Sequence, residues 1–322
     1  MRRPVLLLAL VVLLLAGGCG GGDGESDGTV ARTAAEPPAT EPVSADDPFA
    51  YDAAAPIRFR DLGRVNKASR LQVRDVRFAG AGGKDVAGYL VSPPGEGPYP
   101  AVVYLHGQGG DRLQLVGLAA WLAARGAVAL TLDSPFVASQ PQGTGMAALR
   151  SERDLAVRGI VDTRRAVDLL RSLPQVDDAR IGLVGFSAGA RSAAVLAGVE
   201  HRISSYVIWS GGSEPVSAYT SKLPAGLRAE AGSVLSTLDP LRWVKRSRSA
   251  LLFQDGRTDE VVPRAALERL YRAAPEPKEL RWYAAGHELG VPAYREQLDW
   301  LTAQLKIDGP RVPGADTGPP EG

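Results

Sequence analysis

The fold of this chain is decided by the stretch IGLVGFSAG, residues 181–189. Its first four residues form an apolar run of the length of a buried strand, and the small residues from Ala188 onward favour a helix. Ser187 is therefore expected on a sharp turn between a strand and a helix. Gly185 and Gly189 flank this turn because a Cβ at either position would collide with neighbouring backbone. The turn presents the Ser187 hydroxyl above the end of the strand.

The alternation of strand and helix continues on both sides of this turn. Short apolar runs predict strands at 101–105, 127–132, 181–184, 206–209, 250–253 and 280–283. Helical spacing of apolar residues predicts helices at 113–124, 155–170, 188–198, 264–273 and 292–305. This order implies an α/β fold with a mostly parallel twisted sheet and helices on both faces. Alternating runs at 71–78 and 85–91 predict an antiparallel hairpin at its N-terminal side.

Two further junctions between elements carry an acid and a histidine. In open sheets of this kind, functional groups collect at the carboxyl ends of the strands. The loop after the predicted strand 250–253 contains Asp255, Asp259 and Glu260, and each of these acids can orient an imidazole. His287 follows the last predicted strand, so the order along the chain is serine, acid, histidine. This is the order found in α/β-hydrolases.

The loop 106–110, His-Gly-Gln-Gly-Gly, follows the first parallel strand. Its glycines leave backbone N–H groups bare where a tetrahedral oxyanion can sit. His106 precedes the serine in the chain, so we interpret it as a group that holds this loop and not as the base. The three histidines, at 106, 201 and 287, lack the spacing of metal ligands, so we expect no metal and no organic cofactor.

These motifs resemble those of the α/β-hydrolase superfamily, nearest to its dienelactone hydrolase, acetyl esterase and prolyl-oligopeptidase-like branch. The resemblance covers about residues 71–305 and is most specific over 162–189, which matches the helix and strand leading to that family's nucleophile. It implies the α/β-hydrolase fold and a serine hydrolase with these groups: Ser187 as nucleophile, Asp259 as acid, His287 as base, and the backbone N–H groups of Gln108 and Ala188 as the oxyanion hole.

Two details refine what the resemblance implies. Asp259 occupies the acid position of the pattern G-x-x-D-x-x-V-P at 256–263, whereas Asp255 precedes a glycine and is interpreted as a turn former. Dienelactone hydrolases proper use a cysteine nucleophile. This chain has no thiol after Cys19, so that particular activity is not carried over.

The expected reaction is hydrolysis of small or medium carboxylic esters by two-step acyl transfer. Two alternatives stay open: a serine peptidase of prolyl-oligopeptidase type, and a catalytically silent hydrolase-fold binding lipoprotein. Residues 213–243 interrupt the rhythm of strand and helix, and form either a helical cover for the sheet or a cap that walls the substrate pocket.

The composition excludes other partners. The 322 residues include 37 basic and 36 acidic side chains, which leaves no long-range field to attract nucleic acid. A single cysteine, Cys19, excludes a disulfide within the chain and a site built from several thiolates. We therefore expect a small-molecule ester as substrate, a membrane reached through Cys19, and no nucleic acid.

The N-terminal residues resemble an export signal. Arg2 and Arg3 precede the apolar run 5–16, which is shorter than the roughly 20 residues of a membrane span but fits a signal peptide. Residues 15–19, Leu-Ala-Gly-Gly-Cys, resemble the lipobox of bacterial lipoproteins, in which the cysteine is acylated after cleavage. A lipid anchor at Cys19 would hold the enzyme in the cell envelope, outside the cytoplasm. The predicted segments are a lipoprotein signal peptide at 1–18, a flexible tether at 19–56, the hydrolase domain at 57–307 and a disordered tail at 308–322.

Overall fold

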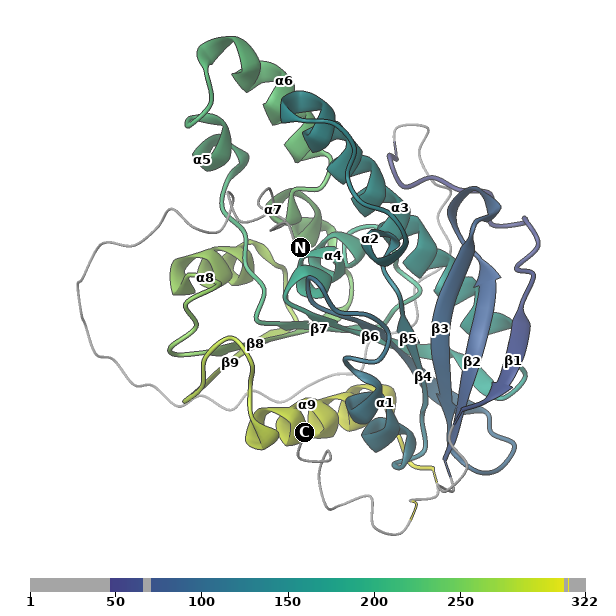
Figure 1. The fold of residues 1–322 in the computed structure, drawn as a ribbon. Helices are drawn as coiled ribbons and strands as arrows, with labels where there is room; N and C mark the ends of the chain where they lie inside the picture. The colour runs from purple at the N-terminus through teal and green to yellow at the C-terminus, as the bar shows by residue number, and fades with distance from the viewer. Residues whose placement is uncertain (1–46, 66–70, 310–311, 313–322) are drawn as a thin grey trace, which may run out of the picture.

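A sheet of nine strands runs through the part of the chain that the structure, a computed structural model, describes: residues 47–65, 71–309 and 312 (Figure 1). The strands lie side by side in the order β1-β2-β3-β5-β4-β6-β7-β8-β9. Their bounds are β1 Arg60–Arg64, β2 Gln72–Ala79, β3 Asp85–Ser92, β4 Tyr99–Leu105, β5 Val128–Leu132, β6 Val176–Phe186, β7 Ser205–Trp209, β8 Ala250–Gly256 and β9 Lys278–Tyr283.

The strand directions confirm the predicted architecture. The pairs β1–β2, β2–β3 and β3–β5 are antiparallel. The remaining neighbours in the sheet, β5–β4, β4–β6, β6–β7, β7–β8 and β8–β9, are all parallel. The predicted hairpin is β2–β3. The edge strand β1 was not predicted, because its sequence Arg-Asp-Leu-Gly-Arg has no apolar alternation and its Leu62 is 55 % exposed. Pairing with β2, and not local sequence, makes this segment a strand.

Helices cover both faces of the sheet (Figure 1). α1 and α9 lie on one face, and α3, α4, α7 and α8 lie on the other. The bounds are α1 Val116–Ala123, α2 Pro135–Ala138, α3 Gly145–Ser172, α4 Ala188–Leu196, α5 Val216–Thr220, α6 Ala225–Ser236, α7 Pro240–Trp243, α8 Arg264–Ala273 and α9 Val291–Leu305, with short 3₁₀ turns η2 Ala81–Gly83 and η3 Val244–Arg246. None of the helices in the described residues is both long and apolar enough to cross a membrane.

Each central strand contributes to two hydrophobic cores. In β4, Ala101 and Val103 pack toward α3 and α4, whereas Val102 and Tyr104 pack toward α1 and α9. Successive side chains of a strand point to opposite faces, so a strand covered on both sides is apolar at every position. The continuous apolar runs in the sequence follow from this double burial.

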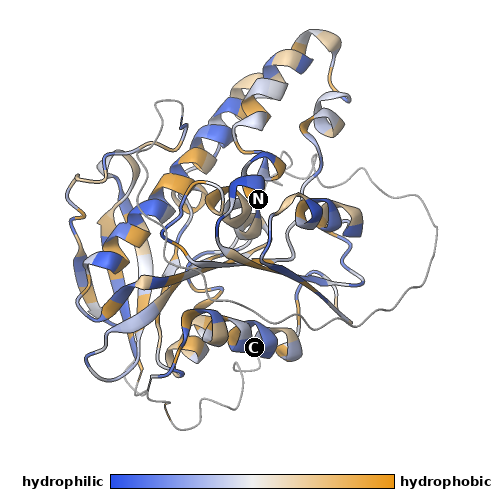
Figure 2. Cartoon of the chain, turned by 180° about the vertical axis from the view of Figure 1, so that it is seen from behind, coloured by the Kyte–Doolittle hydropathy of each residue, from blue (hydrophilic) through white to orange (hydrophobic). Residues whose placement is uncertain are grey.

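Helix α3, Gly145–Ser172, begins ten residues before the predicted helix 155–170. Its first half stands away from the sheet, so it does not need the apolar residues by which the prediction recognised the helix (Figure 1). The segment 145–154 is rich in polar residues and lacks the apolar spacing that revealed 155–170. Figure 2 shows hydrophilic and hydrophobic residues interleaved along this helix. The first half of α3 packs beside α6, with an ion pair between Arg150 and Glu230. α5 and α6 therefore do not form the cover for the sheet that was one interpretation of 213–243, and the cap role stays a prediction.

The folded part begins earlier than predicted. Residues 47–56 were assigned to the flexible tether, yet Phe49 is completely buried with its ring 5.3 Å from that of Trp243. Arg164 on α3 donates to the carbonyl oxygen of Phe49 (2.8 Å), and Arg165 donates to that of Ala55 (2.7 Å). These buried guanidinium groups bind the segment to α3, which explains why two adjacent arginines occupy a buried helix face.

The predicted signal peptide, residues 19–46 of the predicted tether and most of the predicted C-terminal tail lie outside the described residues. The predicted tail begins too early, because Gly309 packs against Gly126 and the Val312 N–H donates to the carbonyl oxygen of Ala124 (2.8 Å).

The substitution Phe49→Ala tests the assignment of 47–56 to the domain. Removing a fully buried ring is expected to lower the free energy of unfolding by about 3–5 kcal/mol. Urea denaturation measures this change. Leu62→Ala on the exposed edge strand serves as the control and should change stability by no more than about 0.5 kcal/mol. A loss below about 1 kcal/mol for Phe49→Ala would show that the segment is not packed in solution.

Candidate active site

The turn between β6 and α4 holds Ser187 in a strained backbone conformation, with φ 54° and ψ −110°. Non-glycine residues rarely adopt positive φ, so the surrounding contacts must maintain it. A Cβ on Gly185 would lie 2.3 Å from the carbonyl oxygen of Gly189, and one on Gly189 would lie 2.3 Å from that of Leu105. The Ser187 N–H donates to the carbonyl oxygen of Trp209 on β7 (2.9 Å). The predicted need for glycine on both sides is confirmed.

The structure brings Ser187, His287 and Asp259 into one hydrogen-bonded chain. Ser187 Oγ lies 2.9 Å from His287 Nε2, and His287 Nδ1 lies 2.8 Å from Asp259 Oδ2. An ionised carboxylate only accepts, so Nδ1 carries the proton that it donates to Asp259, which leaves Nε2 free to accept from the serine. The three residues follow β6, β9 and β8, so they meet at the carboxyl edge of the sheet.

Asp259 is held in its ionised form. Its side chain is only 1 % exposed, and burial by itself would raise its pKa. The hydrogen bond from His287 and the backbone N–H groups of Val261 (2.7 Å) and Val262 (2.9 Å) outweigh burial and hold the pKa of Asp259 below its usual value. A stable carboxylate at this position can orient the imidazole and stabilise its protonated form.

Of the acids that the sequence left open, only Asp259 contacts His287. Glu260 is exposed at the surface. Asp255 is fully buried, and its Oδ1 accepts the N–H of Gly256 (2.8 Å). It lies within β8, opposite Trp282 of β9, so its interpretation as a turn former was wrong.

The loops after β8 and β9 are fastened to each other, which sets the direction of Asp259. The N–H and the hydroxyl of Thr258 both donate to the carbonyl oxygen of Ala285, at 3.1 and 2.9 Å. A Cβ on Gly256 would lie 2.1 Å from the carbonyl oxygen of Gly286. The two loops therefore approach at backbone distance, and this contact holds Asp259 opposite His287.

Ser210 is a site residue that the sequence analysis missed. It follows β7, has φ 49°, and donates from Oγ to the carbonyl oxygen of His287 (2.7 Å). The ring of Phe186 lies 5.3 Å from the imidazole of His287. A polar residue at the end of a central strand, next to Gly211, was the signal that could have identified Ser210.

The loop 107–110 lies against Ser187, where the oxyanion hole was predicted. A Cβ on Gly107 would lie 2.9 Å from the ring of Phe186 and 3.4 Å from Cβ of Ser187. The N–H groups of Gln108 and Ala188 find no acceptor among the described residues. Both remain available to a bound oxyanion.

His106 holds this loop in place, as predicted. Its Nε2 accepts the N–H of Ser134 (3.0 Å), so Nδ1 carries the proton and donates to the carbonyl oxygen of Gly107 (2.6 Å). The side-chain Oε1 of Gln114 accepts the N–H of Gly107 (2.8 Å). The histidine thus connects the ends of β4 and β5 and does not contact the serine. Cys19, the predicted lipidation site, lies outside the described residues.

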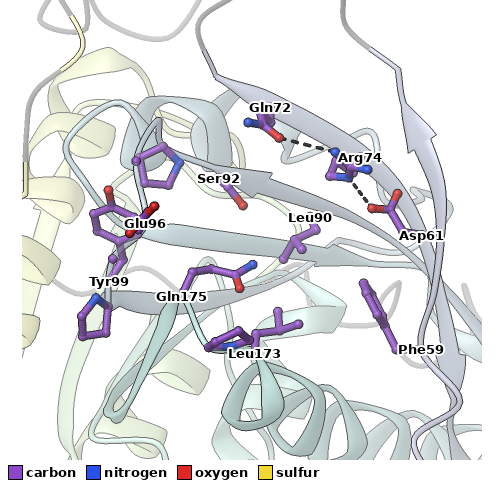
Figure 3. Close-up of a pocket in the computed structure, with 15 residues that line it drawn as sticks. Phe59, Asp61, Gln72, Arg74, Leu90, Ser92, Glu96, Tyr99, Leu173 and Gln175 are labelled. Carbon is purple, nitrogen blue, oxygen red and sulfur yellow. Dashed lines mark hydrogen bonds and ion pairs between the residues drawn. The ribbon is translucent and has the colours of Figure 1, made fainter.

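A surface pocket of about 690 Å³ lies elsewhere on the molecule (Figure 3). Tyr99 at the start of β4 and Gln175, next to the start of β6, belong to its lining, and Arg74 forms an ion pair there with Asp61. Ser187 follows the opposite end of β6. The pocket is therefore not part of the candidate active site.

Comparisons with known proteins show which family the chain belongs to. The family model described as "Dienelactone hydrolase family" matches residues 86–295. The chain is 30 % identical over 235 residues to an uncharacterized protein of Mycobacterium tuberculosis, a match that covers 69 % of this chain and 75 % of that protein. It is also 31 % identical over 129 residues to esterase FrsA of an Enterobacter species, covering 40 % of this chain but only 29 % of the length of FrsA.

Solved structures show the same fold. An acetyl xylan esterase of a Paenibacillus species superposes with a TM-score of 0.66 at 25 % identity, covering 77 % of this chain and 89 % of that one. Acetyl xylan esterase 1 of a Thermoanaerobacterium species superposes with a TM-score of 0.64 at 19 % identity, covering 79 % and 89 %. With its strand–turn–helix at Ser187, its nine-stranded sheet and the match over residues 86–295, the chain belongs to the dienelactone hydrolase family.

Proposed function

We propose that this protein is a serine hydrolase that cleaves carboxylic esters, with Ser187 as nucleophile, His287 as general base and Asp259 as the orienting acid. The observation that carries the proposal is the hydrogen-bonded chain of 2.9 and 2.8 Å through these three side chains. Membership of the dienelactone hydrolase family and the relatives named as esterases support ester hydrolysis. The serine in place of a cysteine separates this chain from dienelactone hydrolases proper.

The first half-reaction acylates the serine. His287 Nε2 takes the proton from Ser187 as Oγ attacks the ester carbonyl, and Asp259 stabilises the resulting imidazolium. The tetrahedral oxyanion accepts hydrogen bonds from the N–H groups of Gln108 and Ala188. One such donor commonly contributes about 3–4 kcal/mol to transition-state stabilisation. Collapse of the intermediate expels the alcohol, which receives the proton from His287.

The second half-reaction returns the free enzyme. Water enters, His287 takes one of its protons, and the hydroxyl attacks the acyl group on Ser187. The carboxylic acid then leaves, and the proton on His287 returns to the serine. The two half-reactions require no metal and no organic cofactor.

Labelling with a fluorophosphonate probe tests the nucleophile. The wild type should be labelled, and Ser187→Ala should lose labelling and roughly 10⁴-fold or more of kcat on an activated ester. Ser172→Ala at the end of α3 is the control and should be labelled like the wild type. An unlabelled wild type would favour the silent binding protein, and labelling that survives Ser187→Ala would place the nucleophile elsewhere.

A pair of substitutions tests the acid. Asp259→Asn turns an NH₂ group toward His287 Nδ1, because its amide oxygen stays with the N–H donors of Val261 and Val262. The imidazole then loses the acceptor for its Nδ1–H, and kcat/KM is expected to fall by about 10⁴-fold. Asp255→Asn should be far less damaging, because Asp255 does not touch His287. Circular dichroism checks that both variants are folded. The assignment fails if Asp255→Asn loses the activity and Asp259→Asn keeps it.

A substrate panel separates the esterase from the peptidase alternative. Esters of one leaving group with acyl chains of increasing length, beginning with acetyl, should be hydrolysed, with the best kcat/KM at small or medium chains. Peptide amides run beside them should not be cleaved at a comparable rate. Preference for the amides would instead identify a peptidase of prolyl-oligopeptidase type.

We further propose that the protein is a lipoprotein of the cell envelope, anchored outside the cytoplasm by acylation of Cys19. Three features support this assignment: the basic Arg2 and Arg3, the apolar run 5–16, and the single cysteine three residues after that run. Detergent-phase partitioning of the protein expressed in a bacterial host tests it. The wild type should enter the detergent phase and Cys19→Ser the aqueous phase, with the same kcat/KM on a soluble ester. A mature wild type with a free Cys19 thiol would refute the anchor and leave the catalytic proposal intact.

A further inference from the structure

Asp255 is a buried acid that the proposed reaction does not use. It lies near the end of β8 and is completely buried. Its Oδ1 accepts the N–H of Gly256, whereas its Oδ2 is buried without a hydrogen-bond partner among the described residues. The nearby Ser210 hydroxyl donates to the carbonyl oxygen of His287 instead. An ionised carboxylate with one donor and no solvent would be strongly destabilising here.

The carboxyl group of Asp255 lies within hydrogen-bonding reach of the carboxyl group of Asp259. Among the described residues no lysine or arginine pairs with either of them, and the only ion-pair partner is His287, on Asp259. Two buried carboxyl groups in contact cannot both be charged without such a cation, so the pair retains one proton.

The hydrogen bonds decide which carboxyl group holds this proton. Asp259 accepts from three donors, which are His287, Val261 N–H and Val262 N–H, whereas Asp255 accepts from the Gly256 N–H and has near it only the Ser210 hydroxyl, which donates to the carbonyl oxygen of His287. More donors stabilise the ionised form, so the charge belongs on Asp259 and the proton on Asp255. In agreement, burial together with the hydrogen bond and the charge of Asp259 raises the pKa of Asp255 to about 8.

We propose that Asp255 is a positioning residue that keeps its proton in the folded enzyme and donates it in a hydrogen bond to Asp259. The chain of hydrogen bonds then runs from Asp255 through Asp259 and His287 to Ser187. The Asp259 carboxylate can accept a further hydrogen bond besides those from His287, Val261 and Val262, and Asp255 supplies it. This added bond fixes the plane of the carboxylate that faces the imidazole. The catalytic part of this inference rests on the proposed function, but the protonation does not.

The groups that face Asp255 set the pH dependence. They are Asp259 and the Gly256 N–H from its own strand and loop, and the Ser210 hydroxyl from the end of β7, with His287 acting through Asp259. The pKa of Asp255 is higher in the folded chain than the value near 4 of an unfolded aspartate, so the folded state binds the proton more tightly. Stability therefore falls as the pH rises from about 4 to about 8, and the loss is complete above the folded pKa.

Thermal unfolding of the wild type and Asp255→Asn measures this effect without any assay of activity. Asparagine is isosteric with a protonated aspartate and donates to Asp259 at every pH. The Tm of Asp255→Asn minus that of the wild type should therefore increase between pH 5 and pH 8, by about 3 °C or more, and then stay constant. Asp178→Asn, on an exposed carboxylate near the start of β6, is the matched control and should give no such increase.

Ester hydrolysis tests the positioning role. Asp255→Ala removes the donor and should lose about tenfold in kcat/KM at pH 7, whereas Asp255→Asn should retain at least about a third of the wild-type value. The wild type should lose activity above about pH 8, where ionised Asp255 repels Asp259, and Asp255→Asn should not show this loss. A merely structural role would not make the high-pH transition depend on the proton at residue 255.

Any one of three results would overturn the proposal. The first is a Tm difference between Asp255→Asn and the wild type that does not change with pH. The others are a tenfold loss of kcat/KM at pH 7 in Asp255→Asn, as in Asp255→Ala, and a high-pH loss of activity that is the same in Asp255→Asn and the wild type. If the protein hydrolyses no ester, the proposed function fails by itself. The Tm comparison still decides the protonation of Asp255 in that case, and it does so even where Asp255→Ala does not fold.

Discussion

The close backbone contacts around Ser187 are the constraint on which the rest of the site depends. Gly189 lies so near the carbonyl oxygen of Leu105 that no side chain fits between them, and the Ser187 N–H is bound to Trp209 on the neighbouring strand. These contacts hold a serine at positive φ that would otherwise relax. They also bring the first N–H of α4 beside the loop 107–110, so Ser187 and the N–H groups proposed as oxyanion donors are positioned by the same backbone crossing.

The parallel sheet then determines which other groups reach the serine. β6, β7, β8 and β9 are successive neighbours, so the loops after them share one edge. His287 comes from the loop after β9 and reaches back across β8 and β7 to Ser187. This reach needs support, which Ser210 supplies from the end of β7 and Asp259 from the end of β8. Each intervening strand thus contributes one hydrogen bond to the imidazole-bearing residue.

Buried charge is resolved in two different ways in this molecule. Arg164 and Arg165 are surrounded by carbonyl oxygens and carboxylates, and their hydrogen bonds attach the N-terminal segment 47–56 to α3. Behind the histidine, no lysine or arginine of the described residues pairs with Asp255 or Asp259, and in our proposal a shared proton takes the place of a cation. Both arrangements follow from the high cost of an uncompensated charge away from water.

The sequence by itself determined the alternation of strands and helices, the glycine-flanked turn at Ser187 and the chain order of serine, acid and histidine. These are local patterns, because strand and helix periods and the steric demand of a tight turn act over a few residues. Only the tertiary structure decided that β1 is a strand, that the domain begins near residue 47, and that Asp255 is buried at the end of β8 beside Asp259. The two aspartates lie on one short stretch, and the sequence pattern favoured Asp259 as the partner of His287 without placing Asp255. The contact of their loop with Ala285 and Gly286, nearly thirty residues further along the chain, directs one toward the imidazole and buries the other.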